Sequence, residues 1–442
     1  MTSMLLISHG TVVTMNDADQ MIEDGAVLIK NDRIVDVGSF DEVVRRHDLS
    51  DATILDATHQ AVLPGLVDLH YHTALGKGWL DHLPLLESLE YFWYPMIRVL
   101  DDEAAYWGAL ASYTESIKCG VTTVNDMFRR LDGLRRAAEE IGIRAVLSND
   151  IADDEHALDT VADARAAHER HHGAGSGRIE VYVGIEWLPI ASEQLLRDCR
   201  ALADELGTGI HIHLNESLGE VENSLQRFGR RPTQVAFDCG ILGPDCIAAH
   251  CVWLSDEEIE LMASTGTHIS HNPTSNAKLG NGVARYPEMV AAGINIGVGH
   301  DAAESSNTRD LFQVMKFTSL IHRATRGDAG IVQARDVLRM ATRNGSQALG
   351  HETGELSVGR KADVITIDLQ SPAFTPLVHG NREHLYSHLV FAANGSCVNS
   401  TIVDGEILMK DRKMLTVDES QVLREANRTF TRMLAGIPPP PE

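Results

Sequence analysis

The chain has 442 residues, 43% of them hydrophobic and 23% charged, which is ordinary for a globular protein with one large domain and one smaller one. Lys and Arg total 38 against 63 Asp and Glu, giving a formal net charge of −25. Such a surface repels phosphate backbones and anionic lipids, so we expect neither nucleic acid nor membrane as a partner. The absence of a signal-like N-terminus and the six scattered cysteines favour a cytoplasmic protein.

Both ends of the chain show the alternation of apolar and polar residues that is typical of β-strands. Because these two strand-rich blocks flank a different middle, we predict one discontinuous β-sandwich domain. Its parts would be residues 1–60 and residues 359–442, the second part also carrying a C-terminal helix or tail. The strand-like segments are Thr11–Met15, Ala26–Lys30, Arg33–Val37, Ala362–Asp368 and Ser400–Met409.

Residues 61–358 alternate short apolar runs with longer amphipathic stretches. Eight such runs, most of them followed by a helical pattern, match the strand count of a (β/α)₈ barrel. An open doubly wound sheet would carry a Gly-rich phosphate-binding turn after its first strand, and none occurs there. We therefore predict an α/β fold with a TIM-like barrel. The runs begin at Ala61, Val121, Ile143, Ile179, Thr208, Cys246, Thr267 and Ile294, and the clearest helical patterns are Asp102–Lys118, Leu131–Ile141, Ser192–Leu206 and Asp256–Ser264.

Four predicted strands end in side chains that can bind a metal or move protons. Strand ends of a barrel meet at its catalytic face, and alternate residues of one strand share a face, so these groups should converge. A lone His-x-His pair is more often a satisfied core or surface feature, but this combination is hard to explain by chance. Three imidazoles and one carboxylate suit one Zn²⁺, with Fe²⁺ or Co²⁺ as alternatives. The groups are His70 and His72, then His213 and Glu216, then His250, then Asp301.

The chain resembles the amidohydrolase superfamily, in the branch of aminohydrolases that act on nucleosides, purines and s-triazines and that includes S-adenosylhomocysteine deaminases and atrazine chlorohydrolases. The resemblance covers nearly the whole chain. It implies the barrel with a β-sandwich, a single metal because no strand-four lysine is present, and a homodimer or higher oligomer. The matching segments begin at Pro64, Gly120, His213, Ala249, Ser270, Lys278 and Gly359.

The resemblance also implies a role for each of the converging residues. Asp301 would orient the metal-activated water and accept its proton, since a bound metal lowers the pKa of water towards about 7. His250 would polarise the substrate or hold the hydroxide. Glu216 would hand a proton to a ring nitrogen and later to the leaving group. His211 is expected to point away from His213. The implied metal ligands are His70, His72, His213 and Asp301.

Several segments depart from the family pattern around the substrate. His300 and Glu304 flank the metal aspartate where the branch carries Thr and Ala, and Trp187 follows strand four where nucleoside deaminases carry a polar motif. These changes favour a flat, compact heterocycle over a nucleoside, unless Glu186 or Glu304 contacts ribose hydroxyls. For each tryptophan, packing at the barrel rim is the alternative. The predicted substrate-binding residues are Trp79, Trp187, Trp253, His271 and Asn276.

We therefore expect a metal-dependent hydrolase that deaminates an amino-substituted nitrogen heterocycle of the cyclic amidine type and releases ammonia. The first alternative is hydrolysis of an amide, urea or carbamate C–N bond, or loss of another ring substituent. The remote alternative is a non-catalytic binding protein on the same fold, which would be expected to have lost ligands that this chain retains.

Overall fold

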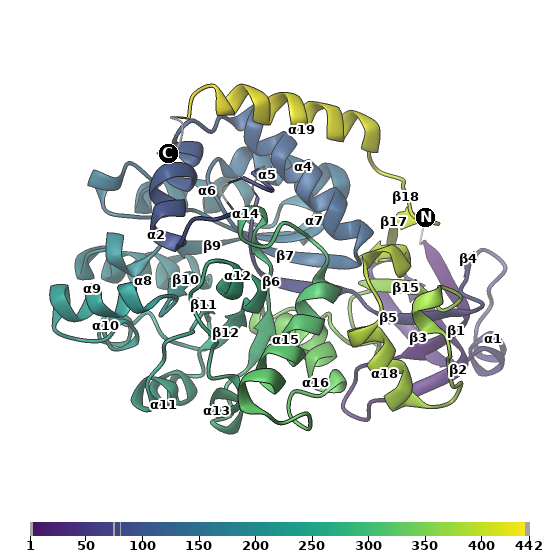
Figure 1. Ribbon diagram of the computed structural model, residues 1–442. Helices are drawn as coiled ribbons and strands as arrows, with labels where there is room; N and C mark the ends of the chain where they lie inside the picture. The colour runs from purple at the N-terminus through teal and green to yellow at the C-terminus, as the bar shows by residue number, and fades with distance from the viewer. Residues whose placement is uncertain (1–2, 74–75, 80, 438–442) are drawn as a thin grey trace.

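Two nine-stranded sheets organise the computed structural model, which describes residues 3–73, 76–79 and 81–437. In Figure 1 the parallel sheet lies at the centre under a layer of helices, and the second sheet lies to one side, where the purple N-terminal and yellow-green C-terminal strands meet. No described helix is long and apolar enough to cross a membrane. All six cysteines are free.

The first sheet joins strands from both ends of the chain, as the alternation predicted. Its order is β18-β17-β16-β15-β5-β1-β2-β3, with β4 beside β1, and the two ends meet where β15 pairs antiparallel with β5. The expected strand over 400–409 is a hairpin instead, because Asp404 and Gly405 form a two-residue turn with positive φ at both positions. The strands are β1 (Met4–Val13), β2 (Met21–Lys30), β3 (Arg33–Ser39), β4 (Thr53–Asp56), β5 (Gln60–Pro64), β15 (Val364–Asp368), β16 (Val398–Val403), β17 (Glu406–Lys410) and β18 (Lys413–Met414).

The second sheet is entirely parallel, with the order β13-β12-β11-β10-β9-β8-β7-β6-β14. Only Gly299 and His300 separate β13 from β14, so a single stretch of chain reaches both edges of the sheet. This arrangement is consistent with a TIM-like barrel. The strands are β6 (Leu66–His72), β7 (Val121–Met127), β8 (Arg144–Ser148), β9 (Ile179–Ile185), β10 (Ile210–Leu214), β11 (Cys246–His250), β12 (His268–His271), β13 (Ile296–Val298) and β14 (Asp301–Ala302).

Helices follow most strands of the parallel sheet, and local sequence signals define their ends. Asp101 accepts a hydrogen bond from the Ala104 amide at the start of α4, and Gly142 ends α5 in the left-handed conformation. The longer helices are α4 (Asp102–Lys118), α5 (Leu131–Ile141), α6 (Val161–His171), α8 (Glu193–Leu206), α9 (Leu218–Phe228), α11 (Asp256–Thr265), α15 (Leu311–Arg326), α18 (Arg382–Phe391) and α19 (Glu419–Leu434). The shorter ones are α1 (Phe40–Arg46), α2 (Leu85–Ser88), α3 (Tyr94–Arg98), α7 (Ala174–Gly177), α10 (Pro232–Asp238), α12 (Pro273–Lys278), α13 (Tyr286–Ala291), α14 (Ala303–Ser306), α16 (Ala334–Arg339) and α17 (Gly345–Ala348).

Two segments show how the chain passes between the first sheet and the parallel-sheet unit. The run that begins at Ala61 splits at Gly65, because β5 belongs to the first sheet and β6 to the second. A side chain at Gly65 would come within 2.1 Å of the Thr122 hydroxyl, so only glycine fits this crossing. At the other end, α19 packs on α4 of the parallel-sheet unit rather than on the first sheet, and Arg432 pairs there with Asp101.

Candidate metal and active site

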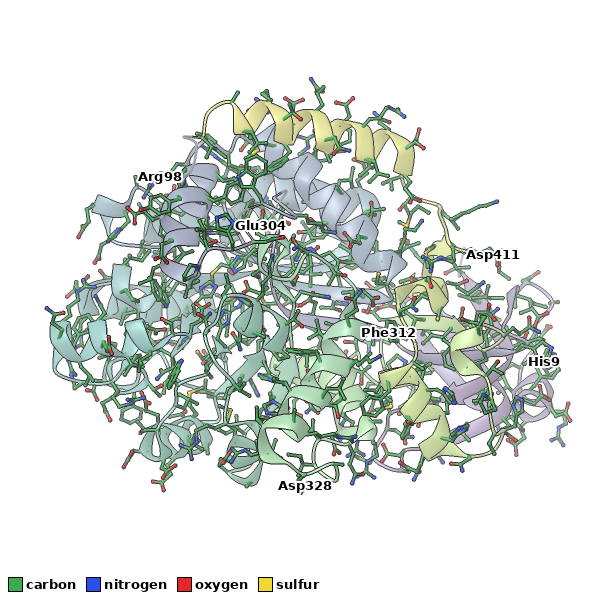
Figure 2. The ribbon with its side chains drawn as sticks, in the orientation of Figure 1. His9, Arg98, Glu304, Phe312, Asp328 and Asp411 are labelled. Atoms are coloured by element: carbon green, nitrogen blue, oxygen red, sulfur yellow. The ribbon has the colours of Figure 1, made fainter. Side chains whose placement is uncertain are left out.

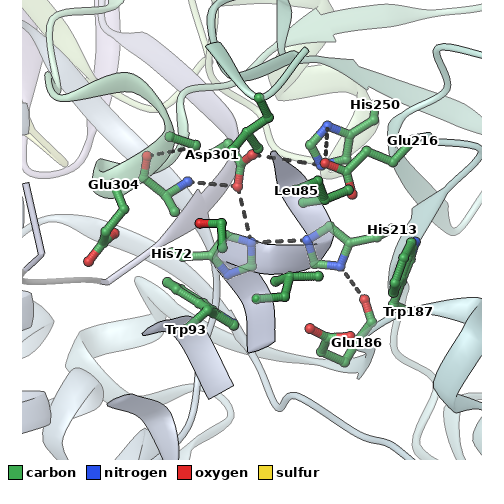
Figure 3. A pocket seen from close by; sticks show the side chains of 15 residues that line it. His72, Leu85, Trp93, Glu186, Trp187, His213, Glu216, His250, Asp301 and Glu304 are labelled. Atoms are coloured by element: carbon green, nitrogen blue, oxygen red, sulfur yellow. Dashed lines mark hydrogen bonds and ion pairs between the residues drawn. The ribbon is translucent and has the colours of Figure 1, made fainter. Parts of the chain in front are cut away.

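A pocket opens where the strands of the parallel sheet end. Its floor is made by residues from β6, β10, β11 and β14, and its walls come from the loops and short helices that follow these strands and the neighbouring β9 and β12 (Figure 3). Parallel sheets bind ligands at the carboxyl ends of their strands, so this pocket is the expected place for chemistry.

Four side chains at the pocket floor converge on one point. Ligand-type atoms of His70, His213, His250 and Asp301 lie within 4.8 Å of one another, and all four residues are buried. The Nε2 atom of His72 adjoins the same point, 3.0 Å from His213 Nε2 and 3.3 Å from Asp301 Oδ1. The His70 and His250 Nε2 atoms are buried without a hydrogen-bond partner in the described structure. Because buried polar atoms without partners are costly, this donor set fits a bound divalent cation.

Each imidazole is held through its other nitrogen. His70 Nδ1 lies 2.8 Å from His211 Nε2, and His72 Nδ1 lies 2.5 Å from the Met127 carbonyl oxygen. His213 Nδ1 contacts the Glu186 carbonyl oxygen. These contacts direct the three Nε2 atoms inward, which is how metal-binding histidines are usually oriented.

His211 therefore does not point away from the site, contrary to the sequence-based expectation. Residues two apart on a strand share a face, so His211 lies on the same side of β10 as His213 and supports His70 from beneath. Correct use of the strand period would have found this residue.

The charge states suit a cation among neutral imidazoles. Burial lowers the pKa of His72 to about 3, with His70 adding to the effect. Burial alone would raise the pKa of Asp301, but the histidines that close around it, with His70 Nε2 3.4 Å from Asp301 Oδ1, hold that pKa well below its usual value. The site thus combines neutral nitrogen donors with an ionised carboxylate, the protonation states that metal binding requires.

Glu216 and His250 lie beside this cluster. Glu216 is 5% exposed, and its Oε1 accepts a hydrogen bond of 2.8 Å from the Asn281 amide and lies 3.8 Å from His250 Nδ1. Burial, together with the charge of Asp301, raises the pKa of Glu216 well above its usual value. A carboxyl group that keeps its proton near neutral pH can act as a general acid.

Unusual backbone conformations concentrate at the same strand ends. Asn215, His250 and Asp301 have φ values of 51°, 73° and 70°, in the left-handed region that costs free energy for residues other than glycine. Such strain is often found where side chains are held for function. Arg309 supports this backbone, because its fully buried guanidinium donates to the carbonyl oxygens of Asp301 and His72.

Trp187 lines the pocket, and the other four predicted substrate-binding residues are not among its described lining residues. Its indole Nε1 donates to Glu220 Oε2 at 3.0 Å, which fixes the ring against the wall. Asn276 lies one step further out, where its Oδ1 is 2.8 Å from His250 Nδ1 and orients that imidazole. His271 is occupied elsewhere, because its Nε2 lies 3.0 Å from His322 Nε2.

Trp79 and Trp253 lie outside the lining, and each is 39% exposed. Trp253 donates to the Asn281 carbonyl oxygen, and the Trp79 ring lies 6.1 Å from Phe92. These two tryptophans pack loops at the rim, the alternative that the sequence left open, and a direct contact with substrate remains a prediction. Several other residues that line the pocket were not predicted from the sequence, namely Leu85, Ser88, Leu89, Leu279 and Ser305.

Comparisons with known proteins agree with this geometry. A model of the amidohydrolase family matches residues 61–408. A 5'-deoxyadenosine deaminase of Methanosarcina mazei is 36% identical over 98% of this chain and 99% of its own length. A 5-methylthioadenosine/S-adenosylhomocysteine deaminase of Thermoanaerobacter pseudethanolicus is 35% identical over 97% of this chain and 99% of its own length. A zinc-bound adenosine deaminase structure from Xanthomonas campestris superposes with a TM-score of 0.90 at 27% identity, covering 98% of each chain. The fold is shared by an atrazine chlorohydrolase structure from Arthrobacter aurescens. It superposes with a TM-score of 0.84 at 23% identity and covers 98% of this chain and 100% of its own.

Proposed function

Because this chain belongs to the amidohydrolase family, we propose that it deaminates the adenine ring of a purine nucleoside by metal-dependent hydrolysis. The observation that carries the proposal is the buried Glu216 beside the converging histidines and Asp301 at the floor of one pocket. Relatives that align over nearly the whole chain are named for deamination of such nucleosides. The chain is thus a hydrolytic aminohydrolase, and the adenine nucleoside is its proposed substrate.

The proposed ligands of one divalent metal are His70, His72, His213 and Asp301, with Zn²⁺ as the first candidate and Fe²⁺ or Co²⁺ as alternatives. When bound, the metal supplies a Lewis acid that activates water for attack on carbon. His250 offers a further nitrogen within the same span. We assign it to the substrate side, because Asn276 orients it and its Nε2 lies 3.8 Å from Asp301 Oδ2.

The protein's own residues then move the protons of the reaction. Asp301, ionised and held by the Ser275 hydroxyl, accepts a proton from the attacking water. Glu216, protonated because of its burial, donates its proton to a nitrogen of the ring and so makes the ring carbon more electrophilic. The proton on Asp301 then passes to the amino group, which leaves as ammonia, and the proton of the newly added hydroxyl group returns to Glu216 as the ring C=O bond forms. Trp187 and Trp93 offer apolar walls for a planar ring.

A nucleoside replaces the compact heterocycle that the sequence favoured. That expectation depended on the loss of polar handles near the substrate, but Glu186 and Glu304 both line the pocket and can accept hydrogen bonds from hydroxyl groups. The named substrates of the relatives point the same way. Polar side chains built into a pocket favour a substrate that satisfies them.

Because the chain belongs to this family, we also propose a complete barrel, a separate β-sandwich domain and an oligomeric assembly. The stretch from β13 to β14 supports a complete (β/α)₈ barrel, and the strands from both chain ends support a separate β-sandwich domain. The resemblance to the family implies a homodimer or higher oligomer, and the scattered cysteines favour a cytoplasmic location. Light scattering at micromolar concentration tests the assembly, and a mass equal to one chain of 48.4 kDa would contradict it.

The activity is tested by measuring bound metal and ammonia release on one preparation. We expect about one transition-metal ion per chain and ammonia release from adenosine, 5'-deoxyadenosine or 5'-methylthioadenosine. Free adenine, pterins and amino-triazines serve as compact-ring comparisons, and simple amides and ureas test the alternative C–N hydrolysis. Turnover of the compact rings with no turnover of nucleosides would refute the proposed substrate, and full activity in a metal-free enzyme would refute the proposed mechanism.

A further inference from the structure

Glu304 is a buried carboxyl group in the pocket that the proposed chemistry does not use. It belongs to the short helix α14, three residues after Asp301, and is 9% exposed. Its Oε1 accepts a hydrogen bond from the Gly76 amide, whereas its Oε2 is buried and has no hydrogen-bond partner in the described structure. Figure 2 shows Glu304 well inside the molecule, unlike the peripheral His9 and Asp328. An unpaired buried carboxylate oxygen is costly, so a missing donor is indicated.

The other charged groups of the pocket have the same sign. Glu186 also lines it, and its Oε2 accepts only a long hydrogen bond of 3.4 Å from the Tyr94 hydroxyl. Among the described residues that line the pocket, none is Lys or Arg. The two nearby cations are engaged elsewhere, Lys278 with Asp81 and the Glu304 carbonyl oxygen, and Arg309 with backbone carbonyls beneath the floor. The pocket therefore offers carboxyl groups and no described cationic side chain to whatever fills it, and burial raises the pKa of Glu186 to about 8.

The position of Glu304 separates it from the reacting end of the substrate. In Figure 3, Glu216 and Glu304 lie on opposite sides of Asp301. A ring whose nitrogen meets Glu216 would extend its remaining substituent away from Glu216, towards the side where Glu304 lies. Burial raises the pKa of Glu304, and a donor on the ligand would offset that cost.

We propose that Glu304 is a specificity residue that accepts a hydrogen bond from a hydroxyl or ammonium group of the substrate, and that with Glu186 it excludes substrates whose substituent is anionic. This inference rests on the proposed function and narrows it. The preferred substrates are adenine nucleosides with a neutral or cationic 5' substituent. Nucleotides and nucleosides ending in a carboxylate are rejected, because their anionic group would be buried beside Glu304 and Glu186 with no cationic side chain among the described lining residues.

The test compares three ligands that share adenine and ribose and differ in charge at the 5' position. They are 5'-amino-5'-deoxyadenosine, 5'-deoxyadenosine and adenosine-5'-carboxylic acid. For each, kcat/KM is measured with the metal-loaded wild-type enzyme, and Kd is measured calorimetrically with the Glu216→Gln variant. The specificity variant is Glu304→Gln, whose amide oxygen can still accept from Gly76. The matched control is Glu87→Gln, which removes an exposed carboxylate next to the pocket-lining Ser88.

We expect the amine to be favoured over the carboxylate by about 10²-fold, both in kcat/KM of the wild-type enzyme and in Kd of Glu216→Gln. Glu304→Gln should reduce that ratio at least tenfold, and Glu87→Gln should leave it within about twofold. Equal use of the amine and the carboxylate would overturn the inference, and so would a failure of all three ligands to bind. It would also be overturned if Glu304→Gln lost kcat on 5'-deoxyadenosine while the ratio of amine to carboxylate stayed unchanged. Binding in the expected order without ammonia release would support the inference and refute the proposed function instead.

Discussion

Glu216 differs from a solvated loop carboxylate by its burial and by its place beside His250 and Asp301. Replacing it with glutamine keeps nearly the same shape but removes the transferable proton. We therefore expect Glu216→Gln to keep its metal and its substrate affinity while kcat falls by about 10²-fold or more. Steady-state kinetics and metal analysis test this. The control is Glu222→Gln, an exposed position on α9, and a near-normal kcat in Glu216→Gln would make Glu216 a bystander.

His70 tests the metal centre more directly than any other ligand, because it is completely buried and its Nε2 faces only the cluster. We expect His70→Ala to lose both the bound metal and the activity while its circular dichroism spectrum stays close to that of the wild type. The control is His9→Ala, a surface histidine that pairs with Asp24. An active variant with a full complement of metal would exclude His70 as a ligand.

Strand-end motifs predicted the side chains that converge at the strand ends, but not the residues that complete the pocket. His70, His72, His213 and Asp301 could be found because strand period and barrel topology bring them together whatever the loops do. The sequence could not show whether Glu186 and Glu304 contact the substrate, because the path of each loop decides whether its side chain faces the substrate or the solvent. Trp79 and Trp253 illustrate this, since both belong to loops that place them at the rim.

At the scale of elements, helix α15 contacts strand β12 through two buried histidines. His322 Nε2 lies 3.0 Å from His271 Nε2, and burial lowers the pKa of His322 to about 4. Between about pH 6.5 and 4 the unfolded chain binds a proton at this position and the folded chain does not, so the free energy of unfolding decreases as the pH falls through that window. For His322 alone the loss is about 1–3 kcal/mol.

The variant His322→Gln isolates this effect, because an amide can still bond to His271 but does not titrate. Urea unfolding at pH 7 and at pH 5 should show a smaller loss of stability in the variant than in the wild type. His379→Gln, at an exposed position, serves as the control and should behave as the wild type does. An unchanged pH dependence in His322→Gln would show that this pair is not responsible.

Elements with strong local signals were predicted closely, and the exceptions have physical causes. The bounds expected for α4 and α5 match the structure, because the Asp101 cap and Gly142 mark helix ends in the sequence itself. The run after Ala61 was predicted as one strand because its hydrophobicity is continuous. It divides at Gly65 because β15, about 300 residues later, pairs with β5 and draws that part into the other sheet. Pairing partners so distant in sequence leave no local pattern.

At the scale of the whole molecule, a buried ion pair joins the two sheets. Arg144, at the start of β8, donates to both carboxylate oxygens of Asp363 at 2.9 Å and also contacts Asp404 in the hairpin of the first sheet. The side chains are 4%, 0% and 7% exposed. The residues come from segments more than 200 positions apart, so composition and net charge gave no indication of this junction.

Removing the cation from this junction should destabilise the molecule strongly, because the buried Asp363 would lose its counter-charge and Asp404 would keep only its 3.6 Å contact with Lys361. We expect Arg144→Met to lower the free energy of unfolding by about 3–5 kcal/mol, measured by urea denaturation. The triple variant Arg144→Met with Asp363→Asn and Asp404→Asn should recover most of that loss, because no net charge stays buried. Arg165→Met, which breaks an exposed pair with Glu205, is the control and should change stability little. If Arg144→Met were no more destabilising than the control, the two sheets would be held together by their apolar contacts alone.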